Sequence, residues 1–160
     1  GPGLAAECSQ LVPVGPAGEM LLAGTARATG AHELKAARLL HALGPTSHFM
    51  PQSEPLLHAT YRQCFGLADE LSLTCLALPA LCCGVHGFPA AVGARVAMNA
   101  VEEHAASQQD EDAEDVHGSS AALTTLEFVL LDERVYNAFA DAAWARWGKG
   151  AVQAEAPVGR

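Results

Sequence analysis

A glycine-bearing segment near the middle of the chain has the residue types best suited to binding chemistry. It spans residues 79–89 with the sequence PALCCGVHGFP, in which Gly84 and Gly87 lie three positions apart. Because glycine has no Cβ, the main chain can fold sharply here and bring a ligand close to backbone N–H groups. The segment contains no Lys or Arg, so an anion would have to be held by backbone dipoles alone.

Two predicted elements flank this turn. Residues 74–78 form a short apolar run, typical of a strand covered by helices on both faces of its sheet. Residues 89–104 are predicted to be helical, with Val92, Val96, Ala100 and Val101 on one side. Unpaired N–H groups between the carboxyl end of a strand and a helix favour phosphate binding. A structural turn that binds nothing has the same pattern, so both interpretations remain open at this point.

Cys82, Cys83 and His86 also raise the question of thiol or metal chemistry. Adjacent cysteines point in different directions and no second Cys/His pair follows at zinc spacing, so no metal site is predicted. A helix N-terminus can lower a thiol pKa, which leaves a nucleophilic Cys83 as an alternative. Small, apolar turn residues are the simpler interpretation of both cysteines.

The remaining segments predict an α/β domain. Strands that alternate with helices of this length are typical of a layered fold with a largely parallel sheet. Within it, His41 is expected to be a hydrogen-bonded core histidine and Asp132 a helix cap. The other expected elements are a helix at 4–11, a loosely ordered segment with some strand character at 19–31, a strand at 35–43, a helix at 53–71, an acidic loop at 107–115, a strand at 126–131 and a helix from 134.

Length and charge limit the function classes. The 160 residues fit one domain, and half of them are apolar. The net charge of −9, with basic residues scattered, disfavours duplex nucleic acid and anionic membranes as partners. No apolar run approaches the ~18 residues needed to cross a bilayer. Five cysteines without a Cys-x-x-Cys pair indicate reduced thiols, so we expect a cytoplasmic or nuclear protein.

Several of these segments together resemble the macro domain family, which binds ADP-ribose and in some members hydrolyses ADP-ribosyl bonds. The resemblance covers nearly all of 1–147, and 78–89 is its most specific motif. It implies a three-layer α/β/α fold with a mixed, largely parallel sheet over 1–147, followed by a flexible tail at 148–160. The other matching pieces are Gly1-Pro2-Gly3-Leu4 with Glu7-Cys8, Gly18-Glu19, residues 38–45, Tyr61-Arg62-Gln63-Cys64 with Leu67-Ala68, and residues 128–132 with Val135-Tyr136.

The resemblance also implies a ligand site. The diphosphate and distal ribose would be held mainly by backbone N–H groups, and two aliphatic residues would lie beside the adenine. His86 and Leu131 stand where family members often have aromatic residues, which predicts binding weaker by ~1 kcal/mol each. No cofactor and no catalytic residue is implied by the matched part. The implied ligand-binding residues are Cys82, Cys83, Gly84, Val85, His86, Gly87, Val129 and Leu131.

Part of the family pattern has no counterpart in this sequence. Before the match to Gly1, macro domains have a first strand, an acidic residue that reads adenine, a central strand that ends in an Asn-rich stretch, and a Gly-rich loop used in hydrolysis. The central strand would lie between the strands at 35–43 and 74–78, so two sheet edges should face a gap. Unpaired edges associate readily, so we expect an upstream segment or a partner chain to complete the sheet, or the two edges to close on each other.

The predicted function is recognition of ADP-ribose or ADP-ribosylated proteins, either as a binding module or as part of a mono-ADP-ribosyl hydrolase. The 160-residue chain alone should bind ADP-ribose weakly or not at all, because half of the cleft is unmatched. The alternative is a degenerate macro-like scaffold that binds no such ligand.

Overall fold

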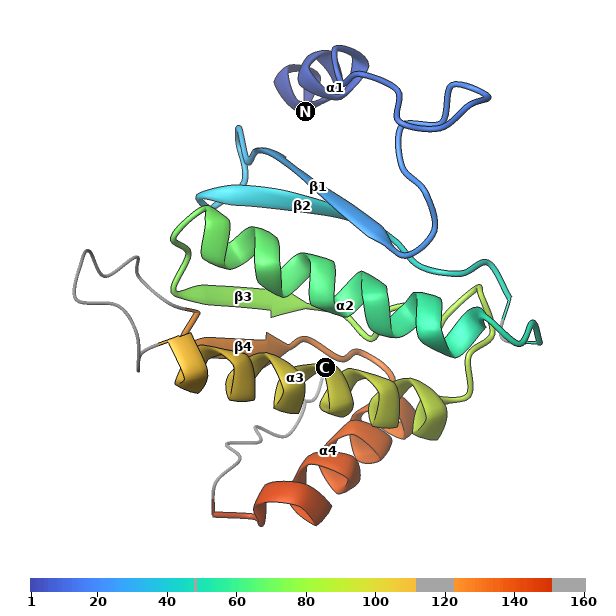
Figure 1. Ribbon diagram of the computed structural model, residues 1–160, viewed down its shortest axis with the longest axis vertical. Helices are drawn as coiled ribbons and strands as arrows, with labels where there is room; N and C mark the ends of the chain where they lie inside the picture. The colour runs from blue at the N-terminus through green and yellow to red at the C-terminus, as the bar shows by residue number, and fades with distance from the viewer. Residues whose placement is uncertain (48, 112–122, 151–160) are drawn as a thin grey trace.

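Helices and strands alternate along residues 1–47, 49–111 and 123–150, which are the residues that the computed structural model describes (Figure 1). The alternation predicted from the sequence is therefore confirmed. The elements in chain order are α1 (Pro2–Ser9), β1 (Thr25–Gly30), β2 (Arg38–Leu43), α2 (Ser53–Glu70), β3 (Cys75–Leu78), α3 (Ala90–Glu111), β4 (Thr125–Phe128) and α4 (Glu133–Trp147).

The strands form two separate pairs. β1 and β2 are antiparallel, in a register from Thr25 opposite Leu43 to Gly30 opposite Arg38. β3 and β4 are parallel, from Cys75 beside Thr125 to Leu78 beside Phe128. Among the described residues β2 and β3 share no ladder. The mixed sheet is thus divided where the gap was expected, and the alternative in which the two edges close on each other is wrong.

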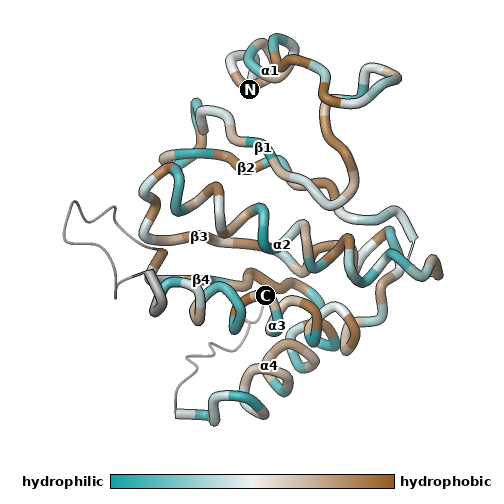
Figure 2. Tube along the Cα trace, viewed as in Figure 1, coloured by the Kyte–Doolittle hydropathy of each residue, from teal (hydrophilic) through white to brown (hydrophobic). Residues whose placement is uncertain are grey.

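Helix α2 joins the two strand pairs through one buried face. It packs against β1, β2 and β3 (Figure 1). Leu57, Tyr61 and Phe65 are each 0% exposed and recur at four-residue spacing on this face. Full burial of such side chains contributes about 1.5–3 kcal/mol each. Opposite them, apolar residues follow one another along β3 (Figure 2), and Leu76 and Leu78 belong to the same core.

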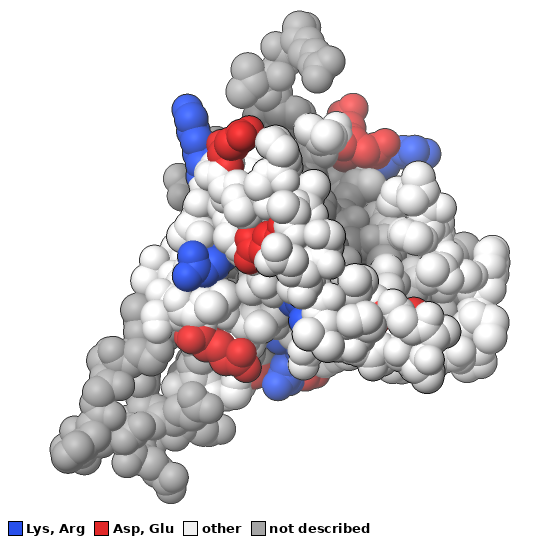
Figure 3. All heavy atoms as spheres, turned by 90° about the horizontal axis from the view of Figure 1, so that it is seen from above, with Lys and Arg blue, Asp and Glu red and all other residues white. Residues whose placement is uncertain are grey.

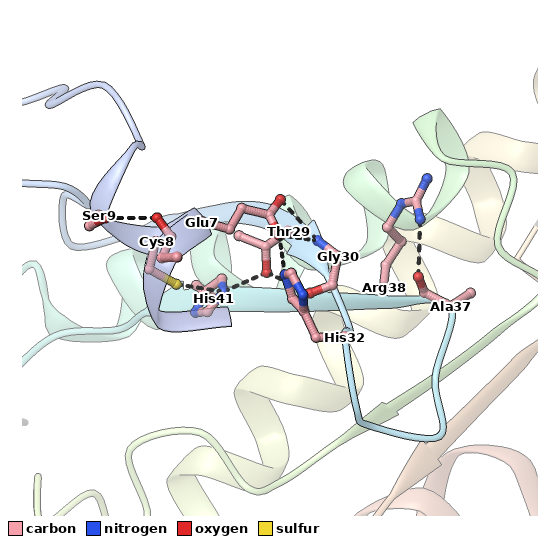
Figure 4. Close-up of polar contacts among 10 residues, drawn as sticks. Glu7, Cys8, Ser9, Thr29, Gly30, His32, Ala37, Arg38 and His41 are labelled. Carbon is pink, nitrogen blue, oxygen red and sulfur yellow. Dashed lines mark hydrogen bonds and ion pairs between the residues drawn. The ribbon is translucent and has the colours of Figure 1, made fainter. Parts of the chain in front are cut away.

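Helix α1 lies on the other face of the β1–β2 hairpin. Leu40 of β2 packs into the core beneath α2, whereas the neighbouring His41 points to α1. The Nε2 atom of His41 lies 2.9 Å from the Thr29 hydroxyl and 3.8 Å from the Cys8 thiol (Figure 4). The hairpin is therefore covered on both faces, and His41 has the hydrogen-bonded role expected for it.

The attachment of α1 is polar, since none of its residues is buried. The Glu7 carboxylate accepts hydrogen bonds from the Gly30 amide at 3.1 Å and lies 2.6 Å from Nε2 of His32 (Figure 4). The contact with His32, followed in size by the hydrogen bond from Gly30, holds the pKa of Glu7 below its ordinary value of 4.5. Glu7 thus fixes the position of α1 on the hairpin.

Two sequence-based expectations need correction. Residues 25–30 form a regular strand rather than a loosely ordered segment, because they pair with β2 and Ala26 packs its small side chain into the core beneath α2. The prediction of an acidic loop at 107–115 is wrong for residues 107–111, which belong to helix α3. The Gln108 amide donates to Asp69 of α2 at 3.1 Å, so a tertiary contact supports the extra turn. Residues 112–115 and the tail beyond 150 lie outside the described residues.

Replacing Glu7 with Gln should weaken the attachment of α1, because the Gln side chain lacks the negative charge that strengthens the contacts with the Gly30 amide and with His32. In the native chain this contact stabilises the fold above the unfolded pKa of Glu7, and the contribution is lost as pH falls through the lowered folded pKa. The NMR shift of the Gly30 amide should therefore titrate with a midpoint below 4.5. Glu70→Gln should leave this titration unchanged, and a midpoint at or above 4.5 would contradict the assignment.

Candidate ligand site at the carboxyl ends of the parallel strands

The predicted ligand residues come from two segments that leave the β3–β4 pair at the same edge. β3 ends at Leu78, and residues 79–89 then lead into α3. The Val129 amide donates to the Leu78 carbonyl at 2.8 Å, which extends the pairing past the end of β4. The structure therefore brings Val129 next to the start of the glycine-bearing loop. In open α/β sheets, this edge is where ligands bind.

The loop is fixed in place by a side chain from α2. The Leu81 amide donates to the Tyr61 hydroxyl at 3.0 Å. Burial raises the pKa of Tyr61 far above its ordinary value, so the phenol stays protonated. Sequence reasoning assigned Tyr61 to the core through its helical spacing and missed its contact with the loop, because spacing predicts which face is buried but not what the hydroxyl touches.

Two consecutive turns shape the loop. The Cys83 amide donates to Ala80 at 3.3 Å, and the Gly87 amide donates to Gly84 at 2.9 Å. Cys82 and Gly87 have φ values of +64° and +72°. Glycine adopts this left-handed conformation readily, while for Cys82 it is unusual and marks a strained turn.

Most of the backbone donors in the predicted cradle are free. Within the described part of the chain, the amides of Cys82, Gly84, Val85 and His86 donate to no protein acceptor. Gly84 is exposed and Val85 is 100% exposed, whereas His86 is half-buried. The segment has therefore not collapsed onto its own amides, and four donors remain available to a ligand. The amides of Cys83 and Gly87 are used inside the turns.

The two cysteine side chains point to different elements. Cys82 Sγ lies against Gly44 after β2, and Cys83 Sγ lies against Gly93 in α3, so that a Cβ on either glycine would collide with sulfur. Burial raises the pKa of Cys82, and burial together with the neighbouring Cys82 raises the pKa of Cys83 to about 11. Burial therefore opposes the activation of Cys83 by the helix N-terminus that the sequence left open. Gly44 and Gly93 were not recognised from the sequence as contacts of the loop.

The other side of the site is aliphatic. Val129 is 57% exposed and Leu131 is 97% exposed. The neighbouring Asp132 is the N-cap of α4, as predicted, and accepts from the amides of Arg134 at 2.9 Å and Val135 at 3.2 Å. The backbone donor Val135 and the nearby Arg134 lower the pKa of Asp132, so this carboxylate stays ionised and engaged with the helix.

Among residues 1–47, 49–111 and 123–150, no cluster of three or more His, Cys, Asp or Glu side chains is arranged to hold a metal ion. No helix of the described chain combines the length and apolarity needed to span a membrane. On the face over α1 and the hairpin, Lys and Arg lie singly among acidic residues (Figure 3).

Comparison with known proteins identifies the family. Residues 1–97 match the model of the Macro domain. The macro domain-containing protein SCO6450 of Streptomyces coelicolor is 34% identical over 140 residues, which cover 88% of this chain and 73% of that protein. This chain belongs to the macro domain family.

Solved macro domains share its fold. The Oceanobacillus iheyensis macrodomain with ADP superposes with a TM-score of 0.74 at 22% identity, over 91% of this chain and 70% of that one. The Trypanosoma brucei macrodomain in complex with ADP-ribose gives a TM-score of 0.67 at 23% identity, over 87% and 50% of the two chains. The α/β macro fold predicted from the sequence is confirmed.

The raised thiol pKa of this macro domain has a measurable consequence. Because the thiolate is the reactive form, alkylation of Cys83 by iodoacetamide should be slow at neutral pH. Its rate should rise about tenfold per pH unit until the pH nears the pKa of about 11. Peptide mass spectrometry after timed alkylation would follow it, with the exposed Cys75 as the internal comparison. Faster labelling of Cys83 than of Cys75 at pH 7 would restore the nucleophile hypothesis.

Proposed function

We propose that this macro domain recognises ADP-ribose, free or attached to protein, through the backbone of residues 82–87. The observation that carries the proposal is the group of free amides at Cys82, Gly84, Val85 and His86, at the edge of the β3–β4 pair. Diphosphate oxygens are strong acceptors, and a run of main-chain donors before a helix is suited to them. The two solved relatives described with ADP and ADP-ribose support the same ligand class.

The expected affinity follows from the chemistry of the site. A hydrogen bond to a charged group contributes about 1.5–3 kcal/mol, so a few backbone donors can hold a diphosphate. Two features weaken binding of the diphosphate. Residues 79–89 contain no Lys or Arg, and the net charge of −9 repels an anion. Val129 and Leu131 add apolar contact without aromatic stacking. We therefore expect weak, saturable binding.

Recognition is favoured over hydrolysis. The thiols of Cys82 and Cys83 have raised pKa values and are poor nucleophiles at neutral pH. The Tyr61 hydroxyl is engaged with the Leu81 amide. His86 is the one imidazole within residues 79–89, and no described carboxylate hydrogen-bonds to it. A hydrolase role would accordingly require groups beyond the described loop.

We also propose that β2 and β3 accept a further strand between them, from another segment of the same polypeptide or from a partner chain. The support is the divided sheet, in which α2 covers both pairs while β2 and β3 share no ladder in the described chain. Edge strands carry unpaired N–H and C=O groups that an extended segment can satisfy. This arrangement also suits a scaffold role, in which the domain binds a neighbouring segment without ADP-ribose.

Gly84→Glu tests the ligand site without disturbing the fold. A Cβ at Gly84 meets nothing within 4 Å and its φ is not positive, so the variant should keep the native melting temperature. The carboxylate should repel a diphosphate and abolish the shifts that ADP-ribose causes in the amide resonances of Val85 and His86. Gly66→Glu adds the same charge on α2 at another open position and should bind normally. Unchanged binding by Gly84→Glu would refute the cradle.

Hydrogen exchange tests the open edges. In the 160-residue chain, the β2 and β3 amides that point away from their paired strands should exchange almost as fast as those of an unstructured peptide, because no acceptor within the described residues protects them. The amides of Leu57 to Phe65 in α2 provide the slow reference, since they lie inside a helix whose inner face is buried. Slow exchange of every β2 and β3 amide would mean that the edges are already paired in solution.

A further inference from the structure

We infer that Tyr61 is a positioning residue of the candidate site, whose hydroxyl holds the amide cradle of residues 82–87 in its ligand-binding shape without touching the ligand. The inference rests on the proposed function and deepens it, because it names a group inside the core that controls the affinity of the cradle. The evidence is the way in which the loop at 79–89 is attached to the rest of the domain. An attachment of a different kind lies at each end of this loop.

The attachment at the start of the loop is polar. The Leu81 amide donates to the Tyr61 hydroxyl at 3.0 Å, one residue before the cradle begins. The next backbone hydrogen bond, from the Cys83 amide to the Ala80 carbonyl at 3.3 Å, stays within the loop. Because an unpaired amide that is removed from water is costly, Leu81 keeps its inward direction only while the hydroxyl accepts from it. The direction in which the chain enters Cys82 therefore depends on one side-chain oxygen.

The attachment at the end of the loop is apolar. Phe88 is 3% exposed and belongs to the core, and its amide donates to the Cys82 carbonyl at 3.0 Å. In the described chain, the backbone of residues 84–86 makes no hydrogen bond to a helix or strand. Apart from the thiol contacts described above, the cradle is thus held from its two ends. A change at either end can alter the directions of the donors between them.

Tyr61 acts on the cradle through Leu81 alone. Its side chain is 0% exposed, so a ligand in the cradle has no surface of the ring or hydroxyl to contact. The ring packs beside Phe65 of α2 and Phe128 of β4, with ring centroids 6.3 and 6.2 Å away. Burial raises the pKa of the phenol far above its ordinary value, so the hydroxyl stays neutral. Its contribution to the site is therefore the orientation of Leu81 and not a charge.

The size of the effect follows from the loss of one hydrogen bond. Without the hydroxyl, the loop should shift toward shapes in which the Leu81 amide reaches water. A ligand that binds only the native shape then meets a smaller competent population, and its apparent affinity falls by the same factor. One lost hydrogen bond to a partly buried amide corresponds to a change of about threefold to tenfold.

Tyr61→Phe tests the inference, because it removes the hydroxyl and keeps the ring in the core. ADP-ribose is titrated into the native 160-residue chain and into the variant, and the amide resonances of residues 84–86 are followed. The variant should bind about threefold to tenfold more weakly, and its ligand-free amides at 81–87 should already be shifted. Binding within about twofold of the native chain would overturn the inference and leave the proposed function standing. Absence of ligand-induced shifts in the native chain would instead overturn the proposed function.

Phe65→Leu is the control for a general loosening of α2. Phe65 lies on the same buried face, and its ring centroid is 5.2 Å from that of His104 on α3. The variant should therefore lower the melting temperature while keeping the hydrogen bond to the loop. At a temperature where both variants are folded, it should bind ADP-ribose as the native chain does. Equal weakening by both variants would assign the effect to lost core packing and overturn the role of the hydroxyl.

Hydrogen exchange in the ligand-free native chain decides the matter even where Tyr61→Phe does not fold. The Leu81 amide should exchange slowly, at a rate near that of the α2 amides, because its acceptor is buried. The Val85 amide should exchange fast, since the residue is 100% exposed and its amide has no acceptor in the described chain. Slow exchange of Leu81 beside fast exchange of Val85 would support the inference. Equally fast exchange of both amides would mean that the hydroxyl does not hold the loop in solution, and would overturn it.

Discussion

Burial of one face of α2 is the interaction on which the rest of the structure depends. The two strand pairs share no ladder in the described chain, so they are held in one unit mainly by the helix that packs on both. Tyr61 is central to that face because its ring is fully buried and lies near Phe128 of β4. The same residue presents its hydroxyl to Leu81. Core packing and loop position are thereby coupled through a single side chain.

This coupling explains why a backbone-made site can exist in an acidic protein. A cradle of amides needs no charged side chain, but it needs a loop that does not collapse onto its own donors. Tyr61 holds the loop at its start. Gly44 leaves space for the thiol of Cys82, and Gly93 leaves space for the thiol of Cys83. With both thiols directed into the fold, the middle of the loop is left facing solvent. The cysteines are thus supports for the loop rather than reactive groups.

The sequence allowed most of the elements and the position of the glycine-bearing loop to be predicted, because both depend on local patterns. Helical spacing identified α2, and an apolar run followed by glycines located the loop at 79–89. Tertiary contacts were not predictable in the same way. The extension of α3 depends on Gln108 reaching Asp69 of α2, and the raised pKa of Cys83 depends on how deeply neighbouring elements bury it. A helix N-terminus alone suggests a lowered pKa, whereas burial of the thiol acts in the opposite direction.

The open position between β2 and β3 lies next to the candidate site, so the two features are related. A strand that lay between β2 and β3 and ran parallel to β3 would end at the same edge as the amide cradle, because the cradle follows the carboxyl end of β3 (Figure 1). Polar side chains at the end of such a strand would face the ligand from the side opposite Val129 and Leu131. A segment in the gap would therefore complete the sheet and could add polar groups to the candidate site. Strand completion and ligand recognition would then be one event rather than two, because the segment that satisfies the open edges would also contact the ligand.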